Sequence, residues 1–283
     1  MKRLLTLALL ASFSLSVQAA TPNTLAKIKS SKTITLAYAP NAIPFSFDDD
    51  KIARPVGYSI DLCESVVAAI KKQLGLAELR IKWVAGTTPE RLAMVAEGKA
   101  DMECGVTTAT LKRQEKVDFT GITFVQAGGI LTRAATGVKS ARDLGGKKIA
   151  VVAGTTTEKR LVDALGRDRI MAEVVPFKDR AEAFRALEED KVSALAGDKI
   201  VLIGLVAKTQ DINKFVLLSE DFSIEPYAFA LRRGDPDFRL AVNRGLARTY
   251  ASGDIVAIFD RWFSPLKPTD LLKALYLFSA LEE

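Results

Sequence analysis

"ECGVTTATLKRQEKVDFT", residues 103–120, contains a cluster of threonines, Thr107, Thr108 and Thr110, followed by a single arginine, Arg113. Hydroxyls and free backbone N–H groups at the end of a strand can bind a small anion such as a carboxylate. Arg113 lies five residues after Thr108, close enough for its guanidinium to contact the same anion. The alternative is a set of turn residues beside a surface arginine.

Strand and helix patterns alternate on either side of this stretch. Residues 34–39 and 80–85 have the pattern of strands, and residues 58–74 carry an apolar stripe at helical spacing. A further helix follows, with Thr87 or Thr88 as its cap. This alternation predicts an α/β fold.

One helix-then-strand pattern occurs twice. Residues 90–105, ERLAMVAEGKADMECG, align with residues 182–197, EAFRALEEDKVSALAG, which indicates a duplicated half. The alternative is that any two helix-strand units look alike. Residues 86–91 and 154–160 both follow strands and open helices, and ligands of open parallel sheets bind beyond such strand ends. We therefore expect two similar edges that face each other across a cleft.

The second of these edges, at residues 154–160, also contains a cluster of threonines. Thr155, Thr156 and Thr157 follow a glycine, and Glu158 lies three residues after Thr155. That spacing is a capping box, so the alternative is simply a well-started helix. Both interpretations agree, because a capped helix start still offers N–H groups and the positive end of its dipole.

Asp198 follows the strand-like segment that ends at Gly197. A carboxylate at this edge suits an ammonium group, and the alternative is an N-cap for a helix at residues 199–207. An anion site on one edge and an ammonium acceptor on the other describe an α-amino acid.

The first twenty residues have the features of a secretory signal peptide. MKRLLTLALLASFSLSVQAA has a cationic start, a short apolar run and small residues before a cleavage point near Ala19 or Ala20. We therefore expect an exported protein. Its two cysteines, Cys63 and Cys104, favour one disulfide in an oxidising compartment. The alternative is two buried free thiols.

Charge and composition exclude several classes of function. The formal net charge is +6, without the basic block that tracks phosphates, so we expect no nucleic-acid partner. The chain has no histidine, which removes the commonest general base and metal ligand together. We expect no metal and no cofactor.

Six motifs between residues 24 and 263 resemble the periplasmic solute-binding proteins for polar amino acids, family three, which serve ABC transporters. They are IPFSF, VGYSIDLCESV, ADMECGVTTATLKRQEKVDFT, DLGGKKIAVVAGTTTE, AFRALE and YAFALRRGDPDF. The glutamate/aspartate binders look most similar. The resemblance implies a two-lobed periplasmic-binding-protein fold (type II), in which two Rossmann-like lobes with parallel sheets are joined by two hinge strands. The expected division is a first lobe of residues 21–126 and 223–283 and a second lobe of residues 127–222.

The resemblance also implies a set of ligand-binding residues. Arg113 would bind the α-carboxylate with Thr108 and the backbone at Gly105 and Val106. Asp198 matches the carboxylate commonly placed near the α-ammonium. The other candidates are Thr155, Thr156 and Thr157 in the second lobe, Thr88 and Arg91 at the side-chain end of the ligand, and Arg180, which occupies a family position but differs from the family's residue.

Three positions depart from the glutamate/aspartate pattern. Ala39 stands in place of an arginine, Val106 in place of a serine and Arg180 in place of a histidine. Once the α-carboxylate and α-ammonium are matched, Arg91 and Arg180 are left over. A guanidinium near a dry cleft is costly without a partner, so we expect at least one of them to contact a second ligand carboxylate or water at the rim.

The combined expectation is a monomeric periplasmic receptor that captures a polar amino acid and delivers it to a membrane permease. Glutamate or aspartate is expected first, with amides or a larger acidic analogue as alternatives. A different class is an enzyme on the same scaffold, because the family includes dehydratases that act on cyclic amino acids. Without histidine, its general acid or base would be a carboxyl group such as Glu103. A sensor domain is expected to carry a membrane segment after the lobes, and we do not expect one here.

Overall fold

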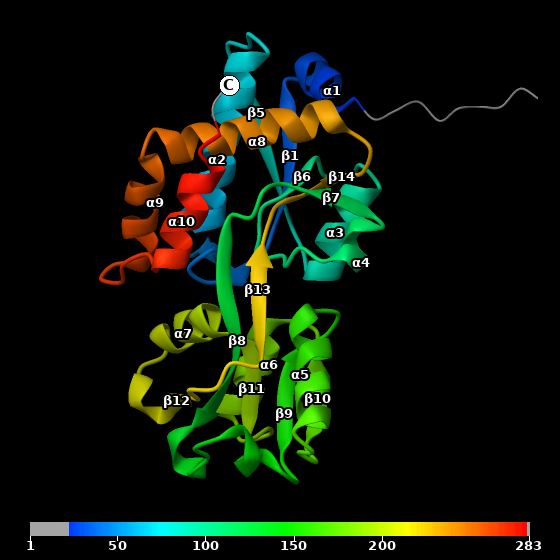
Figure 1. The fold of residues 1–283 in the computed structure, drawn as a ribbon. Helices are drawn as coiled ribbons and strands as arrows, with labels where there is room; N and C mark the ends of the chain where they lie inside the picture. The colour runs from blue at the N-terminus through cyan, green and yellow to red at the C-terminus, as the bar shows by residue number, and fades with distance from the viewer. Residues whose placement is uncertain (1–22, 282–283) are drawn as a thin grey trace, which may run out of the picture.

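The computed structural model describes residues 23–281, which form two α/β lobes with two strands running between them (Figure 1). The predicted signal peptide, residues 1–20, lies outside the described residues. Within the described range, no helix is both long enough and apolar enough to cross a membrane.

The first lobe is built on a five-stranded sheet in the order β5-β1-β6-β14-β7. Its strands are β1 (Thr33–Tyr38), β5 (Arg80–Ala85), β6 (Met102–Glu103), β7 (Val117–Phe119) and β14 (Ala230–Arg232). The pairs β1–β5 and β1–β6 are parallel, whereas β14 runs antiparallel to both of its neighbours. The sheet is therefore mixed rather than purely parallel, because the chain returns through β14 from the opposite direction.

Helices cover both faces of this sheet. They are α1 (Thr24–Ser31), α2 (Tyr58–Gln73), α3 (Thr88–Ala96), α4 (Leu111–Gln114), α8 (Pro236–Ala251), α9 (Asp254–Phe263) and α10 (Asp270–Ser279). A small sheet of β2 (Asn41–Ala42), β3 (Ser46–Asp49) and β4 (Ile52–Val56) lies beside them. The alternation along β1 explains the two layers, since Leu36 packs in one core cluster and Ala37 in another.

The second lobe contains the sheet order β10-β9-β11-β8-β12. Its strands are β8 (Phe124–Arg133), β9 (Lys148–Val152), β10 (Glu173–Phe177), β11 (Ala194–Asp198) and β12 (Phe215–Leu217), and its helices are α5 (Thr156–Arg167), α6 (Arg180–Glu188) and α7 (Lys199–Ala207). Short 3₁₀ turns occupy Ala134–Thr136, Ala141–Leu144 and Ile212–Lys214. This sheet is also mixed, because β8 runs antiparallel to both β11 and β12.

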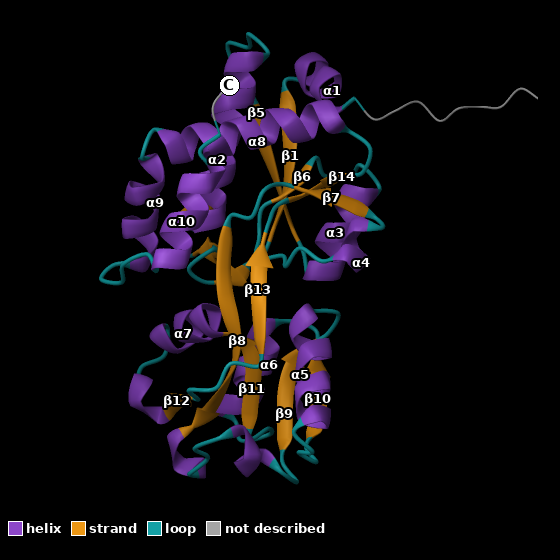
Figure 2. Cartoon of the chain, viewed as in Figure 1, coloured by secondary structure: helices purple, strands orange, loops and turns teal. Residues whose placement is uncertain are grey.

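Two strands connect the lobes, β8 and β13 (Ser223–Tyr227), and they appear side by side in Figure 2. They pair antiparallel, with Glu225 opposite Gln126. The expected lobe boundaries, at 126/127 and 222/223, fall within β8 and at the start of β13, and they stay a prediction.

The two aligned segments have the same local structure. α3 leads to β6 and α6 leads to β11, and each helix begins at the equivalent residue, Thr88 or Arg180. The equivalent turns also match, since Gly98 and Asp190 both have positive φ angles, 72° and 63°.

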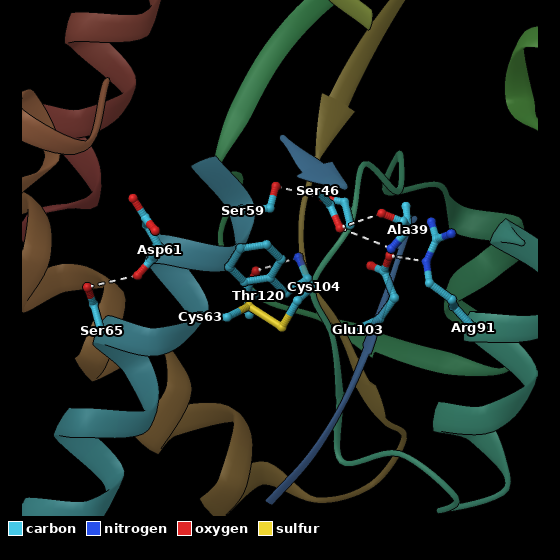
Figure 3. Close-up of a disulfide and its surroundings, with 12 residues drawn as sticks. Ala39, Ser46, Ser59, Asp61, Cys63, Ser65, Arg91, Glu103, Cys104 and Thr120 are labelled. Atoms are coloured by element: carbon cyan, nitrogen blue, oxygen red, sulfur yellow. Dashed lines mark hydrogen bonds and ion pairs between the residues drawn. A yellow bond between two sulfur atoms is a disulfide. The ribbon is translucent and has the colours of Figure 1, made fainter. Parts of the chain in front are cut away.

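A disulfide joins Cys63 on α2 to Cys104 after β6 (Figure 3). Both cysteines are fully buried in the core of the first lobe. The predicted bridge is thus confirmed, and it ties the helix layer to the strand that leads into the threonine-rich stretch.

Removing this disulfide should lower the free energy of unfolding by about 4 kcal/mol, because the reduced unfolded chain regains the entropy of a loop spanning 41 residues. Denaturant unfolding of the oxidised protein and of the Cys63→Ala/Cys104→Ala variant measures the difference. Reductant should destabilise the wild type and leave the double variant unchanged. Two free thiols in the unfolded, unreduced wild type would contradict the bridge.

Candidate ligand-binding site between the lobes

A cavity of about 190 Å³ lies between the two lobes. A water molecule takes up about 30 Å³ in the liquid, so the cavity has room for a small solute. Its lining consists of Pro40, Asn41, Ala85, Gly86, Thr87, Thr88, Glu90 and Arg91 from the first lobe and Val152, Lys178, Asp179 and Arg180 from the second.

Helix starts surround this junction. Thr87 caps α3 in a capping box with Glu90, and Asp179 caps α6 by accepting from Glu182 N. Thr155 caps α5 by accepting from Glu158 N, while the Glu158 carboxylate accepts from Gly154 N. Thr155 is therefore the N-cap, as expected, but the expected capping box is incomplete, because Glu158 accepts from Gly154 N and not from Thr155 N. Helix starts offer N–H groups and a positive dipole end, which favours bound anions.

Arg91 is almost completely buried, with 1% of its surface exposed, and it is ion-paired with the fully buried Glu103. The Nε–Oε1 distance is 2.7 Å. The guanidinium also donates to the carbonyl of Gly86 and to the hydroxyls of Thr88 and Thr107. The expectation that Arg91 is left without a partner is wrong, because Glu103 neutralises it inside the protein (Figure 3).

Gly105 is required by this ion pair. A Cβ atom at Gly105 would approach Glu103 Oε1 to 2.4 Å and Arg91 Nη2 to 2.9 Å, closer than a side chain can tolerate. Glu103 Oε2 is buried and has no hydrogen-bond partner among the described residues. The carboxylate thus keeps unused acceptor capacity.

Arg113 is the guanidinium of the site that keeps free donors. Its Nη1 donates to the Thr108 carbonyl at 2.7 Å, and no carboxylate of the described residues is ion-paired with it. Burial lowers the pKa of Arg113, while the charges of Glu103 and Glu225 raise it. An arginine remains charged despite such a shift, so Arg113 offers a positive charge and several N–H donors.

Asp198 and Arg180 face each other from the second lobe. Arg180 Nη2 lies 4.0 Å from Asp198 Oδ2, so the expectation that Arg180 has no partner is also wrong. Asp198 stands at the N-cap position of α7 but makes no side-chain capping bond; instead it accepts from the Tyr227 hydroxyl. Burial raises the pKa of Asp198 to about 6, against the opposing effect of Arg180.

The lobes touch each other at this site. Thr156 Oγ1 in the second lobe lies 3.2 Å from Thr108 Oγ1 in the first. Both hydroxyls donate to Glu225 on β13, at 2.8 and 2.6 Å. A Cβ atom at Gly154 would come within 2.6 Å of Pro89 Cγ, so only glycine allows this close approach.

The predicted residues are brought together to different degrees. Thr88, Arg91 and Arg180 line the cavity between the lobes. Thr155, Thr157 and Asp198 line a neighbouring pocket of about 20 Å³ that shares Arg180 with it. Val106 differs from both groups, because its side chain packs in the core of the first lobe.

Several residues of the candidate site were not predicted from the sequence. Asn41, Lys178 and Asp179 line the cavity, and Glu225 and Tyr227 bind the predicted side chains from the connecting strand. An acidic residue inside an extended, apolar crossing segment was the available signal for Glu225. In the part of the chain that the structure describes, no group of three or more histidine, cysteine or acidic residues could hold a metal ion.

Comparisons with known proteins agree with this architecture. The chain is 37% identical over 250 residues to the L-glutamate/L-aspartate-binding protein of Pseudomonas aeruginosa, which covers 88% of this chain and 82% of that protein. It is 31% identical over 250 residues to the glutamate/aspartate import solute-binding protein of Escherichia coli K12, with the same coverage.

Solved structures show the same fold. A mutant of ArgBP from T. maritima superposes with a TM-score of 0.75 at 26% identity, covering 86% of this chain and 100% of that one. The ancestral amino acid-binding protein AncCDT-1, a precursor of cyclohexadienyl dehydratase, gives a TM-score of 0.72 at 29% identity, with the same coverage. The type II two-lobed fold expected from the sequence is therefore confirmed.

The family model described as bacterial extracellular solute-binding proteins, family 3, matches residues 34–265. This match spans both lobes and both connecting strands. The chain therefore belongs to the bacterial extracellular solute-binding proteins, family 3.

Proposed function

We propose that this protein is a periplasmic receptor that binds an acidic L-amino acid between its lobes by hinge closure and delivers it to the membrane permease of an ABC transporter. It acts as a monomer, and residues 1–20 direct its export. The work is a difference in affinity between open and closed states, without a chemical reaction.

Relatives support the class of ligand. The Pseudomonas aeruginosa and Escherichia coli proteins are named for glutamate and aspartate. Solved structures with the same fold include an ancestral arginine-binding protein bound to glutamine, at 26% identity. The panel of test ligands must therefore include arginine and the amides beside the two acids.

Arg113 is the observation that carries the proposal. It is partly buried near Glu103, Glu225 and Asp198, and among the described residues its guanidinium donates only to a backbone carbonyl, that of Thr108. A ligand carboxylate would supply the charge-assisted contact that such a guanidinium otherwise lacks. Asp198, with the Tyr227 hydroxyl beside it, would accept the α-ammonium on the other side.

Ion pairing inside the protein distinguishes Arg113 from the other arginines of the site. Glu103 pairs with Arg91, Asp198 with Arg180 and Glu225 with Arg160. Among the described residues, Arg113 donates to the Thr108 carbonyl and is ion-paired with no carboxylate, so a ligand carboxylate would be its partner. The choice of an acidic side chain rests on the relatives named for glutamate and aspartate.

The site gives little support to the alternative that the protein is a dehydratase. Its leading general acid or base, Glu103, is fully buried and ion-paired with Arg91 at 2.7 Å, which holds the carboxylate away from proton transfer to a substrate. We therefore propose a binding protein and assign no catalytic residue.

Arg113→Ala should weaken binding of every amino acid by more than about tenfold, because charge-assisted contacts contribute roughly 1.5 to 3 kcal/mol each. Calorimetry against glutamate, aspartate, glutamine, arginine and leucine measures both the loss and the preference of the wild type. Lys112→Ala is the matched control, since Lys112 lies beside Arg113 on α4 with 84% of its side chain exposed. Preference for arginine or leucine, or an unchanged affinity of Arg113→Ala, would refute the proposal.

Binding should weaken as the pH falls through about 6. The pKa of Asp198 is raised to about 6, so below that pH its carboxyl group is protonated and no longer accepts an ammonium as an anion. Titration calorimetry with glutamate between pH 5 and 8 tests this, and Asp198→Asn should bind weakly at every pH without the step. A flat profile for the wild type would remove Asp198 from the ammonium site.

The pH should affect the stability of the unliganded protein in the opposite direction to its effect on ligand affinity. The folded pKa of Asp198 lies above the ordinary value of 3.8, so between pH 3.8 and about 6 the folded state holds a proton that the unfolded state has lost. The contribution of Asp198 to the free energy of unfolding therefore falls as pH rises through this window. Denaturant unfolding of the wild type and of Asp198→Asn between pH 4 and 7 measures this, and the wild type should lose stability relative to the variant as the pH rises through this window.

A further inference from the structure

Glu225 occupies an unusual position on the strand that leads back to the first lobe. It lies on β13 opposite Gln126 of β8, and its exposed fraction is 0%. The residue opposite it on β8, Gln126, is uncharged and cannot neutralise it. A fully buried carboxylate is costly unless it is hydrogen-bonded or ion-paired, so the groups that reach it decide its role.

Four side chains reach Glu225, and they come from three parts of the chain. Oε2 accepts from Thr108 Oγ1 at 2.6 Å and from Thr156 Oγ1 at 2.8 Å. Oε1 accepts from Ser223 Oγ at 2.6 Å, and Arg160 Nε lies 3.5 Å away. Ser223 belongs to the same strand, whereas Thr108 belongs to the first lobe and Thr156 and Arg160 to α5 of the second.

Thr108 is fixed to the connecting strand by the backbone around it. Ala109 N donates to the Pro226 carbonyl at 2.9 Å, and Ala228 N donates to the Thr107 carbonyl at 3.1 Å. The bond between Thr108 and Glu225 is therefore retained when the lobes move about the hinge.

The contacts from α5 are different, because this helix is anchored in the second lobe. Leu161 and Leu165 of α5 pack in a core cluster with Ile149 and Val151 of β9. A rotation that separates the lobes carries Thr156 and Arg160 away with that core. These two contacts are consequently the part of the Glu225 network that opening breaks.

We propose that Glu225 is a latch that holds the lobes together by bonding Thr156 and Arg160 of the second lobe while it stays attached to Thr108 of the first. The latch rests on the proposed function, since its effect on ligand release presumes a solute held between the lobes. Beyond the proposed function, the latch means that a carboxylate of the protein itself stabilises the closed state, in addition to the ligand contacts.

The latch also determines whether the hydroxyls of two predicted binding residues, Thr108 and Thr156, can donate or only accept hydrogen bonds. A hydroxyl has one proton, and Thr108 and Thr156 both donate theirs to Glu225. Toward a ligand they can only accept hydrogen bonds. Glu225 is thus a positioning residue, which acts on the ligand through these two threonines.

Small-angle X-ray scattering of the unliganded full chain tests the latch directly. Glu225→Gln removes the charge and one acceptor at similar size, and Thr156→Val removes the hydroxyl of the second lobe without touching the buried carboxylate. Both variants should shift to a larger radius of gyration than the wild type, and the double variant should not exceed the larger single effect. With saturating L-glutamate, all radii should coincide.

Glu78→Gln is the matched control, because Glu78 is exposed on the first lobe, and its radius should equal that of the wild type. Thr156→Val decides the question if Glu225→Gln does not fold. Unliganded radii of both variants that equal the wild-type radius would overturn the latch. This comparison needs no ligand, so it stands even if glutamate fails to bind and the proposed function falls.

Ligand release provides an independent readout. Release requires opening, and opening without the latch breaks fewer charge-assisted bonds, so L-glutamate should dissociate roughly tenfold faster from Glu225→Gln. Stopped-flow displacement measures the rate. An unchanged dissociation rate of a Glu225→Gln variant that binds glutamate would also overturn the proposal.

Discussion

The antiparallel pairing of β8 with β13 is the constraint on which the rest of the structure depends. These two strands are the chain segments that pass from one sheet to the other, so any change in the relative position of the lobes must be absorbed there. The polar side chains on the pair are correspondingly well bonded. Gln126 Oε1 accepts from Ile200 N at the start of α7, and Glu225 accepts from Thr156 at the start of α5. Each connecting strand thus reaches one helix start of the second lobe.

The buried charges of the site must each have a partner of opposite charge. Arg91, Glu103 and Asp198 are nearly or fully buried, and each would be strongly destabilising if it were unpaired. The protein pairs Arg91 with Glu103 within one lobe and Arg180 with Asp198 within the other. Neither pair depends on closure, so both lobes can carry their charges in an open state. Among the described residues Arg113 has no such carboxylate, which is why we propose it as the partner of a ligand carboxylate.

Much of the fold could be predicted from local pattern. The helix stripe at 58–74 and the strand at 80–85 match α2 and β5 closely, because burial of one face sets their periodicity. Thr87 and Thr155 also behave as caps, since capping depends on neighbours in sequence. The partners of Arg91 and Arg180 were not predicted. Glu103 lies on strand β6, whereas Arg91 lies on helix α3. Spacing along the chain does not show which side chains of different elements come into contact.

The sequence by itself determined the α/β class, the family and the cysteine pair, because periodicity, motif order and cysteine count are written along the chain. It also placed Thr108 and Asp198 after strand ends, where parallel-sheet proteins bind ligands, with Arg113 close to Thr108 along the chain. Only the tertiary structure decided that Asp198 does not cap α7 and that Glu225 collects hydroxyls from both lobes. The physical reason is that a buried charge takes the partner nearest in space, and that partner is chosen by how the lobes and their two connecting strands pack.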